Sequence, residues 1–369
     1  MAGHLPLGSI VPFLIAAIAL ALLASLVGRA VDALGDRLGA GATGVVQSAL
    51  GNLPELFVCL FALHDGLLDV VRAALVGSVL ANVLLVLGMA FVVGGLRHGT
   101  QRFAAERARL ISLMLVLSVM ALLLPSLAHV LHTPADHHAW GLSIVTSVLL
   151  LVLFALSLPA AMAREPGAKT SPATGETTHG PATGETSDGP STGETSEDGS
   201  PATTEDGDEG SATRSDREWP LALALTVLTL AGVGAALVSD WFVAALQPAI
   251  EAAGISQAFA GLVVVAIAGN AVENVVGIQL AARNQADYAL SVILQSPLQI
   301  TLVVAPVLVL AAPLVGATFT LVLSPFLVAT LLVAALVAVI VVVDGESTWF
   351  EGAALLVLYL LVATAFWWG

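Results

Sequence analysis

The chain has 369 residues, of which 57% are hydrophobic and only 11% are charged, and its formal net charge is −15. A water-soluble fold could not bury so many apolar residues, so this composition excludes a soluble globular protein and indicates a polytopic membrane protein. A bilayer core needs about 20 apolar residues per helix. Ten apolar runs reach that length, at residues 7–28, 42–64, 70–95, 108–132, 140–163, 219–247, 255–282, 287–312, 316–343 and 349–368.

These runs are almost continuously apolar and lack the alternation that is typical of a transmembrane β-barrel, so we expect an all-α membrane protein with ten transmembrane helices. The first run has no basic segment before it and is long for a signal peptide, so we interpret it as a retained span. The single Cys59 excludes an intrachain disulfide.

An acidic segment at residues 164–218 separates five runs from five runs and holds 13 acidic and 4 basic residues. Its degenerate repeats are rich in Gly, Pro, Ser and Thr and cannot build a core. The sequence therefore predicts a five-helix repeat at 1–163, a disordered linker at 164–218 and a second five-helix repeat at 219–369. The linker is either a solvated connection or a calcium-sensing, regulatory segment.

The basic residues predict the orientation. Ten spans place both termini on one side of the membrane, and 11 of the 12 basic residues then fall on the other side, with only Arg72 as an exception. The positive-inside rule makes this basic side cytoplasmic. We therefore expect a multi-pass cell-membrane protein with extracytoplasmic termini and a cytoplasmic linker. Because each half has an odd number of spans, homologous halves would insert as an inverted repeat.

Two pentapeptides, GNLPE at 51–55 and GNAVE at 269–273, repeat one pattern within apolar sequence. A carboxylate at the bilayer centre costs at least ~2.5–3.5 kcal/mol, so two of them indicate a functional polar site. Each glutamate precedes a serine by 23 residues, and a further amide follows each serine. The glycines and the proline of these motifs are alternatively packing or kink residues, although the proline also frees a backbone carbonyl.

This set consists of oxygen donors: two carboxylates, amides, hydroxyls and freed carbonyls. Such hard ligands suit Ca²⁺, which takes about 6–8 oxygens, better than Mg²⁺ or a soft metal. Two close carboxylates also repel one another and tend to bind protons when no cation is present. The same site could therefore alternate between Ca²⁺ and H⁺.

Two other groups of polar residues are open to more than one interpretation. Asp240 is read as interfacial. A group of histidines at span ends or in loops on the outer side is either solvated or a weak metal or pH-sensing site. The histidines are His64, His129, His132, His137 and His138.

Four blocks of the sequence, at 44–63, 77–103, 269–306 and 344–368, resemble the Ca²⁺/cation antiporter superfamily and specifically its Ca²⁺/H⁺ exchanger branch. The resemblance implies a Ca²⁺ site between the two motif helices. By this resemblance the metal site is Glu55, Glu273, Asn52, Asn270, Ser78 and Ser296, and the ion path includes Asn82, Gln299, Asn274, Gly51, Gly269 and Pro54. The chain departs from the family at Asn274, where a histidine is usual, and at Gln295–Gln299. We also expect it to be without the extra N-terminal helix that many members carry.

We therefore expect a secondary antiporter, and not an enzyme, that exports Ca²⁺ from the cytoplasm in exchange for H⁺ by alternating access around a two-glutamate site at the membrane midplane. No GxxxxGK[ST] loop for ATP and no HExxH motif occurs in the sequence. Ca²⁺ is expected as transported substrate, with no cofactor, the lipid bilayer as surroundings and no nucleic-acid partner. The alternatives are a Na⁺/Ca²⁺ exchanger of the same superfamily and, in other classes, a passive cation channel or an intramembrane protease.

Overall fold

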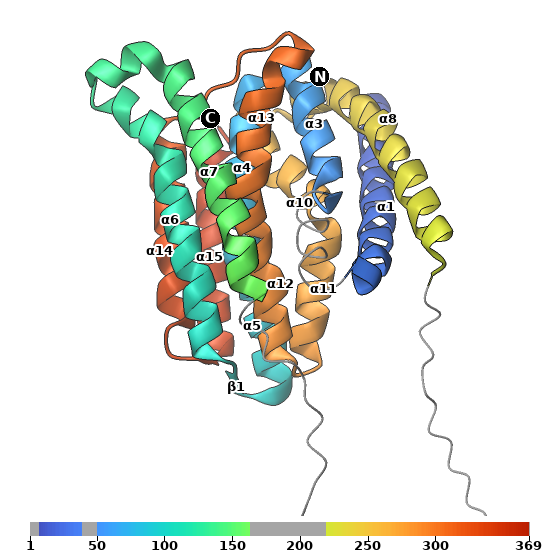
Figure 1. Ribbon diagram of the computed structural model, residues 1–369, viewed down its shortest axis with the longest axis vertical. Coiled ribbons are helices and arrows are strands. Elements are labelled where there is room, and N and C mark those ends of the chain that lie inside the picture. Colours follow the sequence, from blue (N-terminus) through green and yellow to red (C-terminus); the bar gives the residue numbers. More distant parts are fainter. Residues whose placement is uncertain (1–6, 39–49, 163–218, 369) are drawn as a thin grey trace, which may run out of the picture. The chain divides into compact units, whose positions relative to one another are not determined.

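The computed structural model describes residues 7–38, 50–162 and 219–368, which form helices joined by short connections (Figure 1). The sheet in this part of the chain consists of two strands of two residues each. The described residues belong to one compact unit, drawn from 1–164 and 219–369. The predicted all-α class is confirmed.

The elements fall into one series before the acidic segment and one after it. The first series is α1 (Leu7–Leu38), α3 (Leu53–His64), α4 (Leu68–Leu80), η1 (Ala81–Val86), α5 (Leu87–His98), β1 (Gln101–Arg102), α6 (Ala105–Val130), η2 (Pro134–His138) and α7 (Ala139–Met162). The second series is α8 (Leu221–Ala253), α9 (Gln257–Phe259), η3 (Ala260–Val265), α10 (Ala266–Gly269), α11 (Ala271–Ala282), α12 (Ala286–Gln299), η4 (Ile300–Val304), α13 (Ala305–Ala311), η5 (Ala312–Val315), α14 (Pro325–Val342), β2 (Glu346–Ser347) and α15 (Trp349–Phe366).

Eight helical stretches among the described residues have the length and hydropathy of a membrane span. A further pair, Gln257–Gly269 and Asn274–Ala282, is bent by 63° and counts as a ninth span if it crosses as one unit. The predicted run 42–64 is represented by α3, which has 12 residues, while residues 42–49 lie outside the described part. The count of ten therefore stays a prediction at this position.

The predicted start of the run 316–343 is wrong, because α14 begins only at Pro325. Ser324 caps this helix by accepting a hydrogen bond from the Leu327 amide at 3.4 Å, and a proline in the first turn is a typical helix start. Residues 317–324 are not helical. They are apolar and rich in β-branched side chains, and hydropathy alone cannot distinguish such a run from a helix.

Helices α1 and α8 extend beyond their predicted ends at residues 28 and 247, since a helix does not have to stop where its apolar run stops. They have 32 and 33 residues, which corresponds to about 50 Å and exceeds the ~30 Å hydrocarbon core. The two helices pack on one another, with the rings of Phe13 and Phe242 4.9 Å apart. Asp240 is exposed on α8.

Large apolar side chains point away from the protein on both long helices. Ile18 and Leu22 on α1 are each 63% exposed, and Leu230 on α8 is 68% exposed. In water this surface would be strongly unfavourable, whereas lipid tails solvate it without cost. The exposure pattern therefore agrees with a protein that lies in a membrane.

The two series repeat one another at a constant offset. The first residues of α3 and α11 are 218 positions apart, and so are their last residues. The first residues of α4 and α12 have the same separation. The left-handed residues that follow α3 and α11, Gly66 with φ 76° and Asn284 with φ 60°, are also matched at this offset. A π-helical turn follows both α4 and α12. These matches support two repeats of one structural unit.

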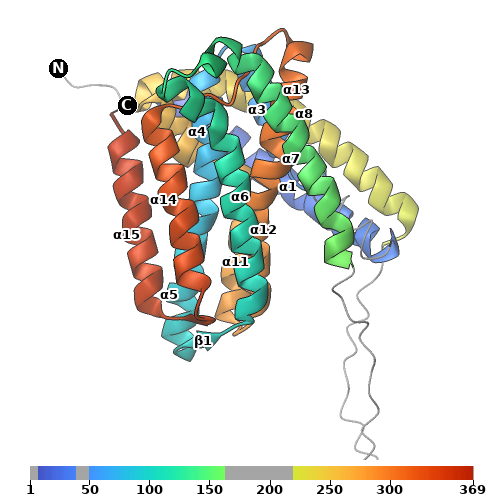
Figure 2. The ribbon, with the colours of Figure 1, turned by 60° about the vertical axis from the view of Figure 1, so that its left-hand side comes forward.

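The repeats run in opposite directions. Helix α3 ends at His64, whose ring contacts Val315, whereas its counterpart α11 ends at Ala282, whose carbonyl contacts His98. These contacts lie at opposite ends of the span Leu68–His98, because His64 lies four residues before its first residue and His98 is its last residue. Figure 2 shows the two parts of this span, α4 and α5, toward opposite ends of the molecule. Matched helices therefore point to opposite ends of the molecule, which is the inverted arrangement that the sequence predicts.

The charged residues distinguish these two ends. We call one the arginine end, because Arg97, Arg102, Arg109 and Arg283 lie at the ends of its helices or in its loops. There Arg102 forms an ion pair with Glu346 at 3.1 Å, beside the pairing of β1 with β2. We call the other the histidine end, because His64, His129, His132, His137 and His138 lie there.

The two repeats approach one another closely where α4 crosses η3. A Cβ atom on Gly77 would lie 2.2 Å from the carbonyl oxygen of Leu262, and one on Gly261 would lie 2.3 Å from that of Val70. Backbone atoms cannot yield as a flexible side chain can. Both positions therefore need glycine, and this crossing brings Ser78, the neighbour of Gly77, next to the second repeat.

We predict that Gly77→Ala lowers stability, because overpacking typically costs about 1–3 kcal/mol. A thermal unfolding curve in detergent would show a clear fall in midpoint temperature. The matched control is Gly232→Ala on α8, where a Cβ atom meets nothing within 4 Å. Equal midpoints for the two variants would contradict the close crossing.

Candidate ion-binding site

Both glutamate motifs lie where a helix is interrupted. Asn52 precedes α3 with φ −94° and ψ 15°, and Asn270 precedes α11 with nearly the same values, φ −106° and ψ 17°. Neither residue continues a regular helix. Each break starts a new helix inside apolar sequence, and irregular backbone at this depth is tolerated where it is buried in protein or lines a cavity.

Glu55 lies in the first turn of α3, where the helix dipole favours a negative charge. Glu55 is only 3% exposed. Among the residues whose side chains the structure describes, it is the one charged residue that is buried. The Ser78 hydroxyl donates a short hydrogen bond to its Oε1 atom. The first motif therefore presents a buried carboxylate to Ser78 on α4 of the same repeat.

A chain of polar contacts continues from Glu55 into the other repeat. Asn270 donates through Nδ2 to the Ser78 hydroxyl at 3.0 Å, and Ser296 donates to Asn270 Oδ1 at 3.4 Å. Asn82 donates to the Ser296 hydroxyl at 3.3 Å. Two serines and two asparagines thus continue the network from the Glu55 carboxylate, and both repeats contribute to it.

A second link between the repeats joins Asn52 to Gln299. The Asn52 Nδ2 atom donates to Gln299 Oε1 at 2.8 Å, and both residues are buried. Because Asn270 bonds to Ser78, the inverted repeat would suggest a matching hydrogen bond between Asn52 and Ser296. The structure instead pairs two amides, so the site is not symmetric.

Two buried amide oxygens in this region accept no hydrogen bond from the residues that the structure describes: Asn82 Oδ1 and Asn274 Oδ1. Asn82 is 0% exposed and Asn274 is 9% exposed. A buried acceptor without a donor costs about 1–3 kcal/mol, so such atoms usually bind something. A cation or an ordered water would satisfy them.

The glycines and the proline of the motifs have identifiable places. A Cβ atom on Gly269 would lie 3.7 Å from Glu55 Cβ and Cγ, so this glycine is directly beside the carboxylate side chain. Pro54 occupies the first turn of α3, where its missing amide hydrogen is not needed. Gly51 lies in the turn before that helix.

The structure brings together most of the residues predicted from the sequence. Joined by hydrogen bonds are Glu55, Ser78, Asn82, Asn270 and Ser296 in one network and Asn52 and Gln299 in one pair. Asn274 is buried one turn after Asn270 on α11. Glu273 is the third residue of α11, but its side chain lies outside the described part, so its role as a ligand stays a prediction.

Sequence reasoning missed the π-helical turns that follow the two serines. Asn82, the second residue of η1, donates to the Ser78 carbonyl at 2.9 Å, and Thr301, the second residue of η4, donates to the Pro297 carbonyl at 2.9 Å. A polar side chain that binds the carbonyl four residues back competes with the helix and bends it. Such turns are frequent at functional sites. The signal was a lone Asn or Thr in apolar sequence.

The donor set determines what the site can do. One carboxylate, hydroxyls and amide oxygens are hard ligands suited to a hard cation. Among the described residues no cluster of three or more His, Cys, Asp and Glu residues could hold a metal ion. A single buried carboxylate with neutral oxygens could also bind a proton in place of the cation.

Comparison with known proteins agrees with this architecture. The sodium/calcium exchanger protein family matches residues 8–162 and 223–368, which includes both repeats. The chain therefore belongs to this family.

Within the family, the chain belongs to the branch that contains the Ca²⁺/H⁺ antiporters. It is 33% identical to a Ca²⁺/H⁺ antiporter of Synechocystis sp., over 97% of this chain and 91% of the relative. It is 32% identical to the Ca²⁺/H⁺ antiporter ChaA of Bacillus subtilis, over 97% and 92%. The solved structure of native YfkE superposes with a TM-score of 0.74 at 28% identity, over 98% of this chain and 97% of that one.

We predict that Asn52 and Gln299 are energetically coupled. In a double-mutant cycle with Asn52→Ala and Gln299→Ala, the free energies of unfolding should be non-additive by about 0.5–1.5 kcal/mol, the net value of one hydrogen bond. The control cycle pairs Asn52→Ala with Thr301→Ala, because Thr301 bonds to Ser118 instead, at 2.9 Å. Additivity in the first cycle would contradict the pairing.

Proposed function

We propose that the protein is a secondary antiporter that moves Ca²⁺ across a membrane in exchange for H⁺. The relatives that cover almost the whole chain carry this activity in their names. The observation that carries the proposal is the oxygen-rich network around Glu55, to which both inverted repeats contribute. A site at the interface of two inverted repeats suits alternating access, in which one site opens to each side in turn.

The chemistry of the exchange follows from the charge of the site. Glu55 and Glu273 are the two carboxylates that would neutralise Ca²⁺, with Ser78, Asn270 and Ser296 as neutral partners. Asn82 Oδ1 and Asn274 Oδ1 are buried acceptors that would complete the oxygen shell or hold its water. When Ca²⁺ leaves, two carboxylates without a cation favour proton uptake, which removes the repulsion between them. Each proton bound therefore lowers the affinity for Ca²⁺, which couples the two fluxes.

The orientation and the repeat boundaries belong to the same proposal. The arginine end is cytoplasmic by the positive-inside rule, which places the termini and the histidine end outside and the acidic linker at 164–218 in the cytoplasm. The repeats are 1–163 and 219–369. In this orientation the protein exports Ca²⁺ from the cytoplasm of the cell, driven by an inward proton gradient.

We predict that Glu55→Gln and Glu273→Gln each abolish Ca²⁺ uptake into inside-out vesicles energised by a pH gradient. The amide keeps the volume but carries neither the charge for Ca²⁺ nor the titrating group for H⁺. Asp240→Asn on α8 is the control, because it makes the same chemical change at an exposed position. Uptake at the wild-type rate in either glutamate variant would refute the two-carboxylate site.

The counter-ion is tested separately. In proteoliposomes without Na⁺, we expect an imposed pH gradient to drive Ca²⁺ uptake at full rate, and an added Na⁺ gradient to change nothing. Uptake that requires a Na⁺ gradient would instead identify a Na⁺/Ca²⁺ exchanger. Ca²⁺ flux that ignores both gradients and follows only its own gradient would identify a passive channel.

A further inference from the structure

A histidine contact lies at each end of the molecule, and neither contact belongs to the ion site. At the histidine end, His64 is the last residue of α3, and its Nδ1 atom lies 3.2 Å from the Val315 carbonyl oxygen at the end of η5. At the arginine end, His98 is the last residue of α5, and its Nε2 atom lies 3.0 Å from the Ala282 carbonyl oxygen at the end of α11. A carbonyl oxygen only accepts, so the ring N–H donates in both contacts.

The two contacts occupy equivalent places in the inverted repeat. Each contact joins the C-terminal end of a helix that carries a motif glutamate to the C-terminal end of a span that carries a serine of the site. Helix α3 meets the span Ala286–Val315, and α11 meets the span Leu68–His98. These spans begin 218 positions apart, and each contact therefore bridges the two repeats.

From this placement we infer that His64 and His98 form two latches, one at each end, that hold α3 and α11 in their closed positions. The inference rests on the proposed function, since alternating access requires a barrier at each end of the site. Breaking the His64 latch frees the end of α3 and opens the path at the histidine end. Breaking the His98 latch, together with the bonds that Gln101 makes at the same end, frees the end of α11 and opens the path at the arginine end.

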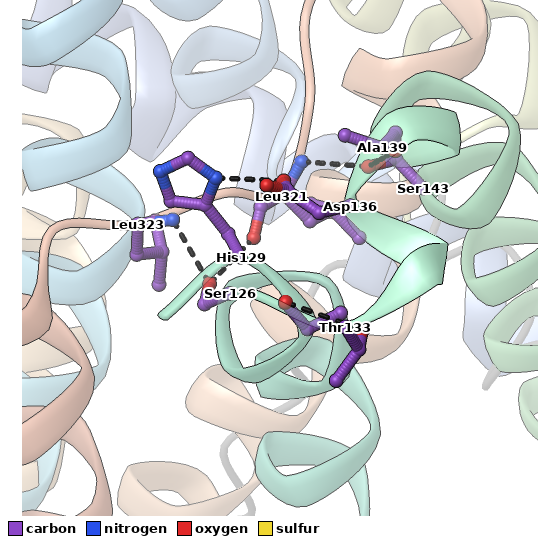
Figure 3. Close-up of polar contacts among 9 residues, drawn as sticks. Ser126, His129, Thr133, Asp136, Ala139, Ser143, Leu321 and Leu323 are labelled. Carbon is purple, nitrogen blue, oxygen red and sulfur yellow. Dashed lines mark hydrogen bonds and ion pairs between the residues drawn. The ribbon is translucent and has the colours of Figure 1, made fainter. Parts of the chain in front are cut away.

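The histidine-end latch has a fixed support behind it. Val315 leads through Gly316 into the non-helical segment 317–324, which two serines hold (Figure 3). Ser126 on α6 accepts from the Leu323 amide at 2.9 Å and donates to the Leu321 carbonyl at 2.8 Å. Ser143 on α7 accepts from the Leu321 amide at 3.1 Å.

The loop between α6 and α7 is itself closed by a local contact between a histidine and a carboxylate. His129 Nδ1 lies 2.7 Å from Asp136 Oδ1, and Figure 3 shows this pair beside Ser126.

Because Ser126 and Ser143 hold segment 317–324, Val315 lies at the end of an anchored segment. The movable partner of this latch is α3, which carries Glu55.

The arginine-end latch is stronger, because additional groups hold α11. Gln101, which is 3% exposed, donates to the Ala281 carbonyl at 3.0 Å and to Asn284 Oδ1 at 2.9 Å. Its side chain fills the space beside Gly94, where a Cβ atom would lie 1.9 Å from Gln101 Oε1. Two side chains, His98 and Gln101, therefore hydrogen-bond to the end of α11. Among the described residues, His64 makes the one side-chain hydrogen bond between the end of α3 and the other repeat, although α3 also packs against η5 and α8. The latch at the histidine end should release more easily.

Cys59 offers a native reporter for the opening of α3. It is the only cysteine of the chain, it lies one turn after Glu55, and it is 1% exposed. It lies between Glu55 and His64 on α3, so a displacement of α3 would change its exposure. A charged, water-soluble methanethiosulfonate reagent added on one side of the membrane would reach it only when α3 is displaced.

The experiment measures the rate of Cys59 labelling in right-side-out and inside-out vesicles. His64→Ala should raise labelling from the face that carries the histidine end by about three- to tenfold, the effect of losing one hydrogen bond. His64→Gln keeps an N–H donor and should restore much of the protection. His98→Ala should not raise labelling from either face, because the contact that it removes is made to α11 and not to α3. His137→Ala is the control, since this exposed histidine lies outside both latches.

Unchanged labelling in His64→Ala would overturn the inference, and so would an equal rise in His98→Ala, which would indicate general loosening. The midpoint temperatures of thermal unfolding show whether His64→Ala or His98→Ala fails to fold. If His64→Ala does not fold, Cys59 labelling in His64→Gln is compared with the unmodified protein instead. Labelling requires no transported ion. If the labelling pattern is as expected while pH-driven Ca²⁺ uptake is absent in the unmodified protein, the latches stand and the proposed function fails.

Discussion

The cost of a carboxylate in an apolar interior governs this structure. Glu55 is almost completely buried in a chain whose surface is solvated by lipid, so its charge needs partners from the protein, from a bound cation or from a proton. The helix break at Asn52, the dipole of α3, the Ser78 hydroxyl and the amides beyond it all meet this need. Without a cargo that binds there, such an arrangement would only lower stability.

The inverted repeat explains how one chain builds this site. Each repeat places a motif glutamate at the start of a short helix and a serine next to a π-helical turn. Helices that point in opposite directions then bring their starting turns together at the same depth. The close crossing at Gly77 and Gly261 allows Ser78 to reach Asn270 of the other repeat. The close approach of the two backbones at these glycines thus brings the polar residues of the two repeats into one site.

Much of the site was readable from the sequence, because charged and amide side chains are rare within membrane spans and a repeated spacing selects them. Which of these side chains form hydrogen bonds with one another could not be predicted from the sequence. Spacing predicts which residues lie at the same depth, but the contact of Asn52 with Gln299 depends on the tertiary crossing. Segment 317–324 was predicted as helix, because an apolar extended run and an apolar helix have the same hydropathy. Its bonds to Ser126 and Ser143, from distant sequence, and the burial of Phe319 and Leu321 hold it in a non-helical conformation.

In the proposed function, the buried network binds Ca²⁺ and H⁺ in competition. The direct measurement is a Ca²⁺ titration of the purified protein in weakly buffered detergent solution, with binding and released protons recorded together. Because a cation must displace protons from the carboxylates, we expect proton release that tracks Ca²⁺ binding, and neither signal in the Glu55→Gln, Glu273→Gln double variant. Ca²⁺ binding without proton release, or binding that persists in the double variant, would contradict it.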